Sequence, residues 1–183
     1  MTAHRSHPQF SACGLNCGLC PRFYTAGSSR CPGCGGEDFS AKHPACGVLS
    51  CSLKRGLEYC YLCGEYPCKK YDKALVDSFI THQHIFSDPE RVLRLGMEIY
   101  LSELEEKMAL LQRMLQDYDD GRRKSFFCLA VNLLPLEAVR AALAESEVGS
   151  ADGPKTLKER AVKISELFHA EAEKHGITLK LVK

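Results

Sequence analysis

The chain begins its cysteine-rich part with Cys13-Gly14-Leu15-Asn16-Cys17-Gly18-Leu19-Cys20 and ends it with Tyr59-Cys60-Tyr61-Leu62-Cys63-Gly64-Glu65-Tyr66-Pro67-Cys68. Ten of its eleven cysteines lie between these ends, and three pairs of them are separated by two residues: Cys17/Cys20, Cys31/Cys34 and Cys60/Cys63. Two thiolates three positions apart on a tight turn can bind one ion, and two such turns complete a tetrahedral site. Three pairs within one segment therefore indicate that metal organises this part of the chain.

Glycines follow two of these pairs. Gly35 follows Cys34 and Gly64 follows Cys63, so we predict a positive φ at both glycines, with backbone N–H groups directed at sulfur. This arrangement is typical of the knuckles of zinc ribbons and rubredoxin-like sites. The segment is therefore predicted to be an irregular, zinc-knuckle-like domain.

All ten clustered cysteines are candidate metal ligands, and along the sequence they form two groups of five. The first group is Cys13, Cys17, Cys20, Cys31 and Cys34, and the second is Cys46, Cys51, Cys60, Cys63 and Cys68. In the simplest assignment, one metal is bound by Cys17, Cys20, Cys31 and Cys34. The second metal then takes Cys60, Cys63 and Cys68 with either Cys46 or Cys51. Cross-braced pairing fits the spacing equally well.

A disulfide framework is the alternative explanation for so many cysteines. Residues 1–10 contain no apolar segment of the kind found in secretion signals, and no run approaches the roughly 18 apolar residues of a membrane span. We therefore expect a cytoplasmic protein with reduced thiols and no membrane partner. In that compartment clustered cysteines usually bind metal.

The charge of residues 1–70 fits thiolate sites. This segment carries eight Lys/Arg against four Asp/Glu, which leaves it at +4, whereas the whole chain is +1. Two four-thiolate sites, each with a divalent ion, would add −2 each and bring the segment to about zero. The cations are therefore interpreted as compensation for thiolates rather than as a nucleic-acid footprint.

Four blocks of this segment, taken in order, resemble DUF3795, a cysteine-rich prokaryotic family of uncharacterised function. The blocks are Cys13 to Pro21, Cys31-Pro32-Gly33-Cys34, Cys46 to Cys51, and Tyr59 to Cys68. The resemblance covers residues 13 to about 72. It implies zinc binding and no particular reaction.

From Tyr71 onward cysteine nearly vanishes and amphipathic helices are predicted. Ser87-Asp88-Pro89-Glu90 predicts a capping box. An apolar stripe then predicts one helix of about 30 residues that ends near Gly121. Its members are Met97, Leu101, Leu104, Met108, Leu111, Leu115 and Tyr118. The stripe is interpreted as a core face, with a homodimeric coiled coil through residues 88–120 as the alternative.

The rest of the chain continues in short segments. The apolar run 126–131, which contains Cys128, is predicted to be buried as helix or strand, and Pro135 begins a helix that reaches about Glu147. A loop follows at residues 148–154. A second capping box at Thr156 begins the last helix, which Gly176 stops. The alternation after Ile177 predicts a half-buried terminal strand.

Together these patterns predict a mainly α protein with an irregular, metal-stabilised module. Residues 1–70 form the cysteine-rich metal-binding module, and residues 71–183 form the helical domain. The module packs on a bundle of three to four helices that carries the short terminal strand. Because residues 1–70 are rich in Gly, Pro and Cys, metal is expected to supply stability that an apolar core does not.

Three functions fit the sequence. The first is an interaction or recognition module for an unknown protein or nucleic-acid partner, built on two structural zinc ions. The second is an electron-transfer or redox-sensing protein with [4Fe–4S] clusters, because Cys13-x3-Cys17-x2-Cys20 has the spacing of radical-SAM cluster ligands. A radical-SAM enzyme itself is not expected, because the remaining sequence lacks the strands of a large α/β barrel.

The third function is a small enzyme, with a pocket between the two parts. Its anion site would be the basic triplet Arg122, Arg123 and Lys124 at the start of a helix. A solvated basic turn is the simpler interpretation. No Gly-rich phosphate loop and no Ser/His/Asp grouping supports catalysis. His43, beside Cys46, is interpreted as a solvated loop residue, and Cys128 as buried and inert.

Overall fold

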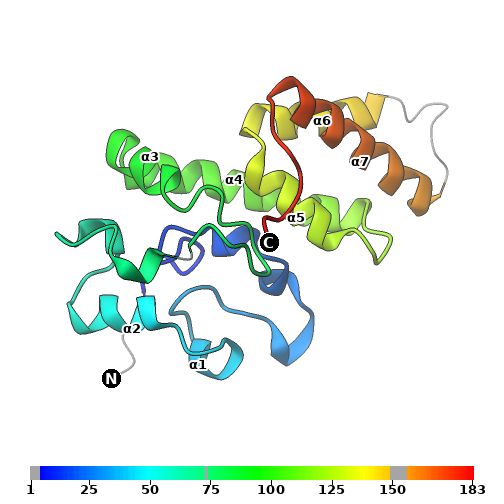
Figure 1. Cartoon of the computed structure of the whole chain (residues 1–183). Helices are drawn as coiled ribbons and strands as arrows, with labels where there is room; N and C mark the ends of the chain where they lie inside the picture. The colour runs from blue at the N-terminus through cyan, green and yellow to red at the C-terminus, as the bar shows by residue number, and fades with distance from the viewer. Residues whose placement is uncertain (1–4, 73, 149–155) are drawn as a thin grey trace. The chain divides into compact units, whose positions relative to one another are not determined.

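The computed structural model describes residues 5–72, 74–148 and 156–183, and its regular elements are helices throughout (Figure 1). The chain divides into two compact units. Unit 1 is Met1–Leu104 with Leu181–Lys183, and unit 2 is Glu105–Lys180. The predicted domain boundary between residues 70 and 71 was drawn from amino-acid composition, whereas these units are defined by contacts. That boundary stays a prediction.

The cysteine-rich segment of unit 1 contains only short helices. Two are α-helical, α1 (Phe39–Lys42) and α2 (Gly47–Lys54). The others are single 3₁₀ turns: η1 (Cys17–Leu19), η2 (Pro21–Tyr24), η3 (Gly27–Ser29), η4 (Cys60–Leu62) and η5 (Lys69–Tyr71). Such turns suit a sequence in which Cys, Gly and Pro interrupt every helical pattern. Tertiary contacts therefore have to hold most of this segment.

A small aromatic core lies under these turns. Phe10 is fully buried, and its ring centroid lies 5.5 Å from that of Tyr59 and 4.9 Å from that of Tyr100. The buried guanidinium of Arg5 lies 4.8 Å from the Tyr59 ring centroid and donates hydrogen bonds to the carbonyl oxygens of Phe10 (2.9 Å) and Glu58 (3.0 Å). The N-terminal residues are thereby tied to the chain near Tyr59.

The long helix predicted after residue 87 is two helices, so its prediction as one element is wrong. α3 (Ser87–Leu95) and α4 (Met97–Asp117) are separated by Gly96, whose φ of 88° and ψ of 153° break the helical path. Gly can take this conformation because it lacks a Cβ atom. The apolar stripe itself is confirmed, since Leu101, Leu104, Leu111 and Tyr118 are all buried.

The capping box predicted at Ser87 is also wrong. The residue before α3 is Phe86, and no side chain caps the helix. The Ser87 hydroxyl donates to the His84 carbonyl (3.4 Å) instead of accepting from the helix. Buried Asp88 accepts a hydrogen bond from the Asn16 amide (2.8 Å), and Tyr100 donates to the oxygen of that amide (2.8 Å). Asp88 is therefore used to fix the turn that carries Cys17.

The described residues of unit 2 contain the remainder of α4 and three further helices. They are α5 (Lys124–Leu133), α6 (Leu136–Val148) and α7 (Leu157–Lys174), and α6 and α7 pack side by side (Figure 1). The apolar run 126–131 lies within α5, and Cys128 on it is buried, as expected. The predicted loop at residues 148–154 lies mostly outside the described residues. None of the described helices is both long and apolar enough to cross a membrane.

The predicted terminal strand is wrong, because residues 177–183 form no strand and none occurs elsewhere in the described parts of the chain. Asp77 pairs with Val182 of this tail. Its N–H donates to the Val182 carbonyl (2.9 Å), and its carboxylate accepts from the Val182 N–H (2.8 Å). An alternating pattern forms a strand only when a neighbouring segment continues the ladder, and the contacts of Asp77 do not extend into one.

The capping box at the start of α7 is confirmed. The Thr156 hydroxyl accepts from the Glu159 N–H (3.2 Å), and the Glu159 carboxylate accepts from the Thr156 N–H (3.0 Å). We expect Thr156→Ala to lower the free energy of unfolding by about 1 kcal/mol, because a helix N–H loses its partner. Chemical denaturation followed by circular dichroism measures the change. Thr178→Ala, at an exposed position after the helix, is the control, and equal losses in both variants would contradict the capping role.

Candidate metal centres

The ten clustered cysteines line two cavities of unit 1. One cavity, of about 320 Å³, is the six-cysteine chamber, and it is lined by Cys13, Cys17, Cys20, Cys31, Cys34 and Cys46. The other, of about 170 Å³, is the four-cysteine site, and it is lined by Cys51, Cys60, Cys63 and Cys68. All of these cysteines carry free thiols. The fold thus brings together cysteines up to 33 positions apart within one cavity.

This spatial grouping differs from the five-and-five division along the sequence. Of the two alternative ligands for the second metal, Cys46 lines the chamber of the N-terminal cysteines. Cys51 lines the cavity of Cys60, Cys63 and Cys68. Cys46 precedes the first turn of α2 and Cys51 lies within that helix. Five residues along a helix turn the side-chain direction by roughly 140°, so the two thiols face different cavities.

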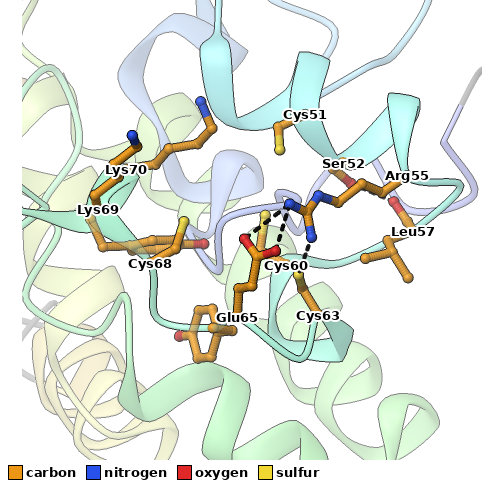
Figure 2. A pocket seen from close by; sticks show the side chains of 12 residues that line it. Cys51, Ser52, Arg55, Leu57, Cys60, Cys63, Glu65, Cys68, Lys69 and Lys70 are labelled. Atoms are coloured by element: carbon orange, nitrogen blue, oxygen red, sulfur yellow. Dashed lines mark hydrogen bonds and ion pairs between the residues drawn. The ribbon is translucent and has the colours of Figure 1, made fainter.

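Three pieces of backbone build the four-cysteine site (Figure 2). Cys51 comes from α2, Cys60 and Cys63 begin and follow the turn η4, and Cys68 precedes η5. The Cys63 N–H donates to the Cys60 carbonyl (2.9 Å), which closes the two-residue spacing into a knuckle-like turn. Both thiols line the same cavity as Cys51.

Polar side chains surround the sulfur atoms of this site. Arg55 donates to the Cys63 sulfur (3.2 Å) and, through its other terminal nitrogen, to both Glu65 oxygens (2.9 Å each), as Figure 2 shows. Burial raises the pKa of Cys60, and a hydrogen bond from Tyr71 lowers it. Lys69 and Lys70 also line the cavity. Among the side chains around the four thiols, cations therefore outnumber carboxylates.

Two tight loops and one helix end build the six-cysteine chamber. Cys17 and Cys20 are joined by η1, where the Cys20 N–H donates to the Cys17 carbonyl (3.1 Å). Cys31 and Cys34 come from the following loop, and the Cys34 N–H donates to the Pro8 carbonyl (2.8 Å). Cys46 precedes α2, and its sulfur accepts from a backbone N–H of that helix at 3.5 Å.

Burial dominates the electrostatics of the chamber. It raises the pKa of Cys13 to about 12 and that of Cys17 well above its usual range, and neighbouring thiolates add to both effects. Burial also raises the pKa of Cys20 and Cys34, while backbone N–H groups lower it. Thiols in such surroundings ionise when a cation takes up the negative charge.

The segment 74–85 supplies a wall of the chamber that the sequence did not suggest. Ile80, Ile85 and His82 line it, and the His82 ring nitrogen Nδ1 lies 2.8 Å from the Ala74 carbonyl oxygen. His43 also lines the chamber and stacks on Phe39 at 4.5 Å, so it is not a purely solvated loop residue. The composition had placed residues 74–85 with the helical domain, and no metal-ligand spacing marks them.

The glycine prediction is half right. Gly35 has a φ of 69°, as expected after Cys34, whereas Gly64 does not have a positive φ. The Tyr66 N–H donates to the Cys63 carbonyl (3.0 Å), which closes an ordinary turn over Gly64 that needs no left-handed residue.

The thiols of both cavities are the donors that thiophilic metals prefer, but they are not arranged around a common point. As the side chains stand, no three His, Cys, Asp or Glu groups within residues 5–72, 74–148 and 156–183 converge closely enough to hold an ion. The thiols line the walls of two shared cavities. Sets of four or more thiols select zinc or iron–sulfur clusters over harder cations.

The basic triplet of unit 2 has carboxylate partners of its own. Arg123 forms an ion pair with Asp120. Asp120 also accepts from the Arg122 N–H (3.1 Å), and Asp119 accepts from the N–H groups of Gly121 (3.1 Å) and Arg123 (3.2 Å). These carboxylates occupy donors that a bound anion would use. The arrangement favours a self-contained basic turn over an anion site at Arg122, Arg123 and Lys124.

Comparisons with other proteins identify the cysteine-rich segment. No curated protein and no solved structure matches the chain significantly. The family model of DUF3795, a protein of unknown function, matches residues 9–73. This range contains all the cysteines of both cavities. Residues 9–73 of this chain are therefore similar to DUF3795, as the order of their cysteine blocks predicted.

Proposed function

We propose that residues 9–73 form a metal-binding module in which the four-cysteine site holds a structural zinc ion. The observation that carries this proposal is that Cys51, Cys60, Cys63 and Cys68 line one cavity although they come from three separate pieces of backbone. Structural zinc sites are closed by four protein ligands, most often thiolates, in tetrahedral geometry. A set of four thiols meets that requirement without further ligands.

The groups around the thiols support a structural role. Four thiolates and one Zn²⁺ carry a charge of −2, and Arg55, Lys69 and Lys70 supply positive charge at the cavity. The hydrogen bond from Arg55 to the Cys63 sulfur is of the kind that orients and stabilises metal thiolates. Four protein ligands leave no open coordination position, so the ion would not activate water.

The proposed role of the module is recognition of a protein or nucleic-acid partner. An ion in the four-cysteine site would fasten α2 to the turns η4 and η5. It would thereby fix the exposed side chains of that surface, among them Leu62 and Lys69. Zinc supplies rigidity to segments that are too poor in apolar residues to pack by themselves.

An iron–sulfur protein is the second candidate, and one observation favours it. Cys13, Cys17 and Cys20, which have the spacing of cluster ligands, line the same chamber with three further cysteines. A [4Fe–4S] cluster there would give an electron-transfer or redox-sensing function. Thiolate ligation alone suits either metal.

The colour and metal content of the protein distinguish the two candidates. We expect protein purified without oxygen, from cells supplied with iron and zinc, to be colourless and to contain zinc. Replacement of zinc by Co²⁺ should produce the absorption bands of tetrahedral cobalt thiolate. A brown protein with iron and acid-labile sulfide would replace the zinc proposal by the iron–sulfur one. Protein with neither metal would contradict both.

A pair of cysteine variants locates the proposed zinc. Cys63→Ser is expected to lose one zinc per chain, because one of four thiolates is gone and Arg55 loses its sulfur acceptor. Cys128→Ser is the matched control, since Cys128 is buried in α5 of unit 2, outside both cavities. Zinc content is measured by elemental analysis of each purified variant. Unchanged zinc in Cys63→Ser would overturn the assignment to the four-cysteine site.

A further inference from the structure

Tyr71 lines both cavities of unit 1, the four-cysteine site and the six-cysteine chamber. The residue is only 8% exposed, and its ring belongs to a buried apolar cluster. Cys13 of the chamber packs against this cluster, as do Cys60 and Cys68 of the four-cysteine site. A hydroxyl group at such a position needs a hydrogen-bond partner, because burying it without one costs free energy.

Hydrogen bonds hold Cys60 next to this hydroxyl. The Cys60 N–H donates to the Ala12 carbonyl (2.8 Å). The Tyr71 hydroxyl donates to the carbonyl of the next residue, Cys13 (3.3 Å). Cys60 and the hydroxyl are therefore attached to consecutive residues of one segment. The same hydroxyl is also within hydrogen-bonding reach of the Cys60 sulfur.

The bond from Tyr71 to the Cys13 carbonyl is a weak one. Hydroxyl groups usually donate to oxygen at about 2.5–3.0 Å, whereas the distance here is 3.3 Å. A zinc-bound thiolate carries negative charge, so it accepts a hydrogen bond more strongly than a neutral carbonyl does. The hydroxyl should therefore donate to Cys60 once bound zinc holds that side chain as a thiolate.

We propose that Tyr71 is a positioning residue of the four-cysteine site, and that its hydroxyl donates to the Cys60 thiolate when zinc is bound. This inference rests on the proposed function and adds to it a residue that no cysteine spacing marks. Arg55, which donates to the Cys63 sulfur, has a side chain that is 43% exposed. The site would thus have one donor to sulfur at the surface and one in the buried wall, and together they orient two of its thiolates.

Tyr66 provides a matched control in the same cavity. It also lines the four-cysteine site and packs against the same cluster as Cys60. Its ring centroid lies 5.2 Å from that of Tyr71, with the two rings nearly perpendicular at 86°. Its hydroxyl is buried and has no hydrogen-bond partner among the described residues. Tyr66→Phe therefore removes the same group as Tyr71→Phe and leaves the donor to Cys60 in place.

Zinc affinity and the cobalt spectrum of the full chain test this role. Competition with a chromophoric chelator measures the affinity for the zinc ion that Cys63→Ser loses. We expect Tyr71→Phe to weaken it roughly 10–100-fold, as is typical when a group that supports a metal ligand is removed, and Tyr66→Phe to leave it unchanged. In the Co²⁺ form, the thiolate-to-metal charge-transfer band of Tyr71→Phe should move to lower energy, because a thiolate without its hydrogen bond gives up an electron more easily.

The outcomes separate a failure of this inference from a failure of the proposed function. Wild-type protein without a zinc ion that Cys63→Ser loses would overturn the proposed function, and this inference with it. If that ion is present and Tyr71→Phe matches the wild type in affinity and in spectrum, the role of Tyr71 is overturned and the zinc site stands. Equal weakening in Tyr71→Phe and Tyr66→Phe would show a general loosening of the cluster, which also overturns the assignment to Tyr71.

Discussion

Removal of the bound metal with a strong chelator is expected to unfold residues 9–73 while α5, α6 and α7 keep their structure. The cysteine-rich segment has only one- and two-turn helices, and its apolar core is small. Structural zinc contributes about 10–16 kcal/mol to the folding of zinc-finger peptides, which is comparable with the whole stability of a typical domain. The loss of folding free energy on metal removal should therefore exceed the loss caused by any single substitution.

Hydrogen exchange measured with peptide resolution checks this prediction. Peptides from α2 and from residues 57–71 should lose protection after chelation, whereas peptides from α5 and α6 should not. Unit 2 has its own core, in which Leu111, Met114 and Phe168 are fully buried. Return of protection on addition of zinc, but not magnesium, is the control. Unchanged protection of residues 57–71 in metal-free protein would contradict the proposed structural role of the metal.

The spatial grouping of the ten cysteines differs from their grouping along the sequence. Spacing identified ten ligand candidates, but it could not separate Cys46 from Cys51, because their directions depend on where α2 starts. Spacing also could not reveal Ile80 and Ile85 in the chamber wall, since tertiary packing brings them there. The candidate ligands can therefore be chosen from local spacing, whereas the division into six and four depends on how the segment folds.

The helical half shows the same limit. Periodicity identified the buried face of α4 correctly, because that face depends only on the repeat. It could not detect the break at Gly96, since a glycine within a periodic stretch is compatible with a continuous helix. The tail after Ile177 alternates like a strand, yet pairing requires a neighbour that the sequence does not specify.

A substitution at Gly33 tests how the backbone positions the chamber cysteines. Gly33 has a φ of 87°, and a Cβ atom there would lie 2.3 Å from the Pro8 carbonyl oxygen. We expect Gly33→Ala to lower the free energy of unfolding by roughly 3 kcal/mol, from backbone strain together with the displacement of Pro8. Denaturant unfolding of the metal-loaded protein measures the loss.

Two other glycines separate strain from close contact. Gly27 has a φ of 74° but nothing within 4 Å of its added Cβ, so Gly27→Ala should show the strain alone, about 1 kcal/mol. Gly47, at the start of α2, has neither a positive φ nor a close neighbour, and Gly47→Ala should be neutral or slightly stabilising. Equal losses at Gly33 and Gly27 would show that the contact with Pro8 contributes nothing.

The same variant links the fold to metal binding. The Pro8 carbonyl that a Cβ at Gly33 would displace is the acceptor for the Cys34 N–H (2.8 Å), and Cys34 lines the six-cysteine chamber. Displacement of this carbonyl should move Cys34 and weaken metal binding in the chamber, while Cys51, Cys60, Cys63 and Cys68 keep their ion. Gly33→Ala should therefore retain the one zinc ion that Cys63→Ser loses, as measured by elemental analysis of both variants. Loss of that zinc in Gly33→Ala would show that the strain spreads through unit 1 instead of acting at Cys34.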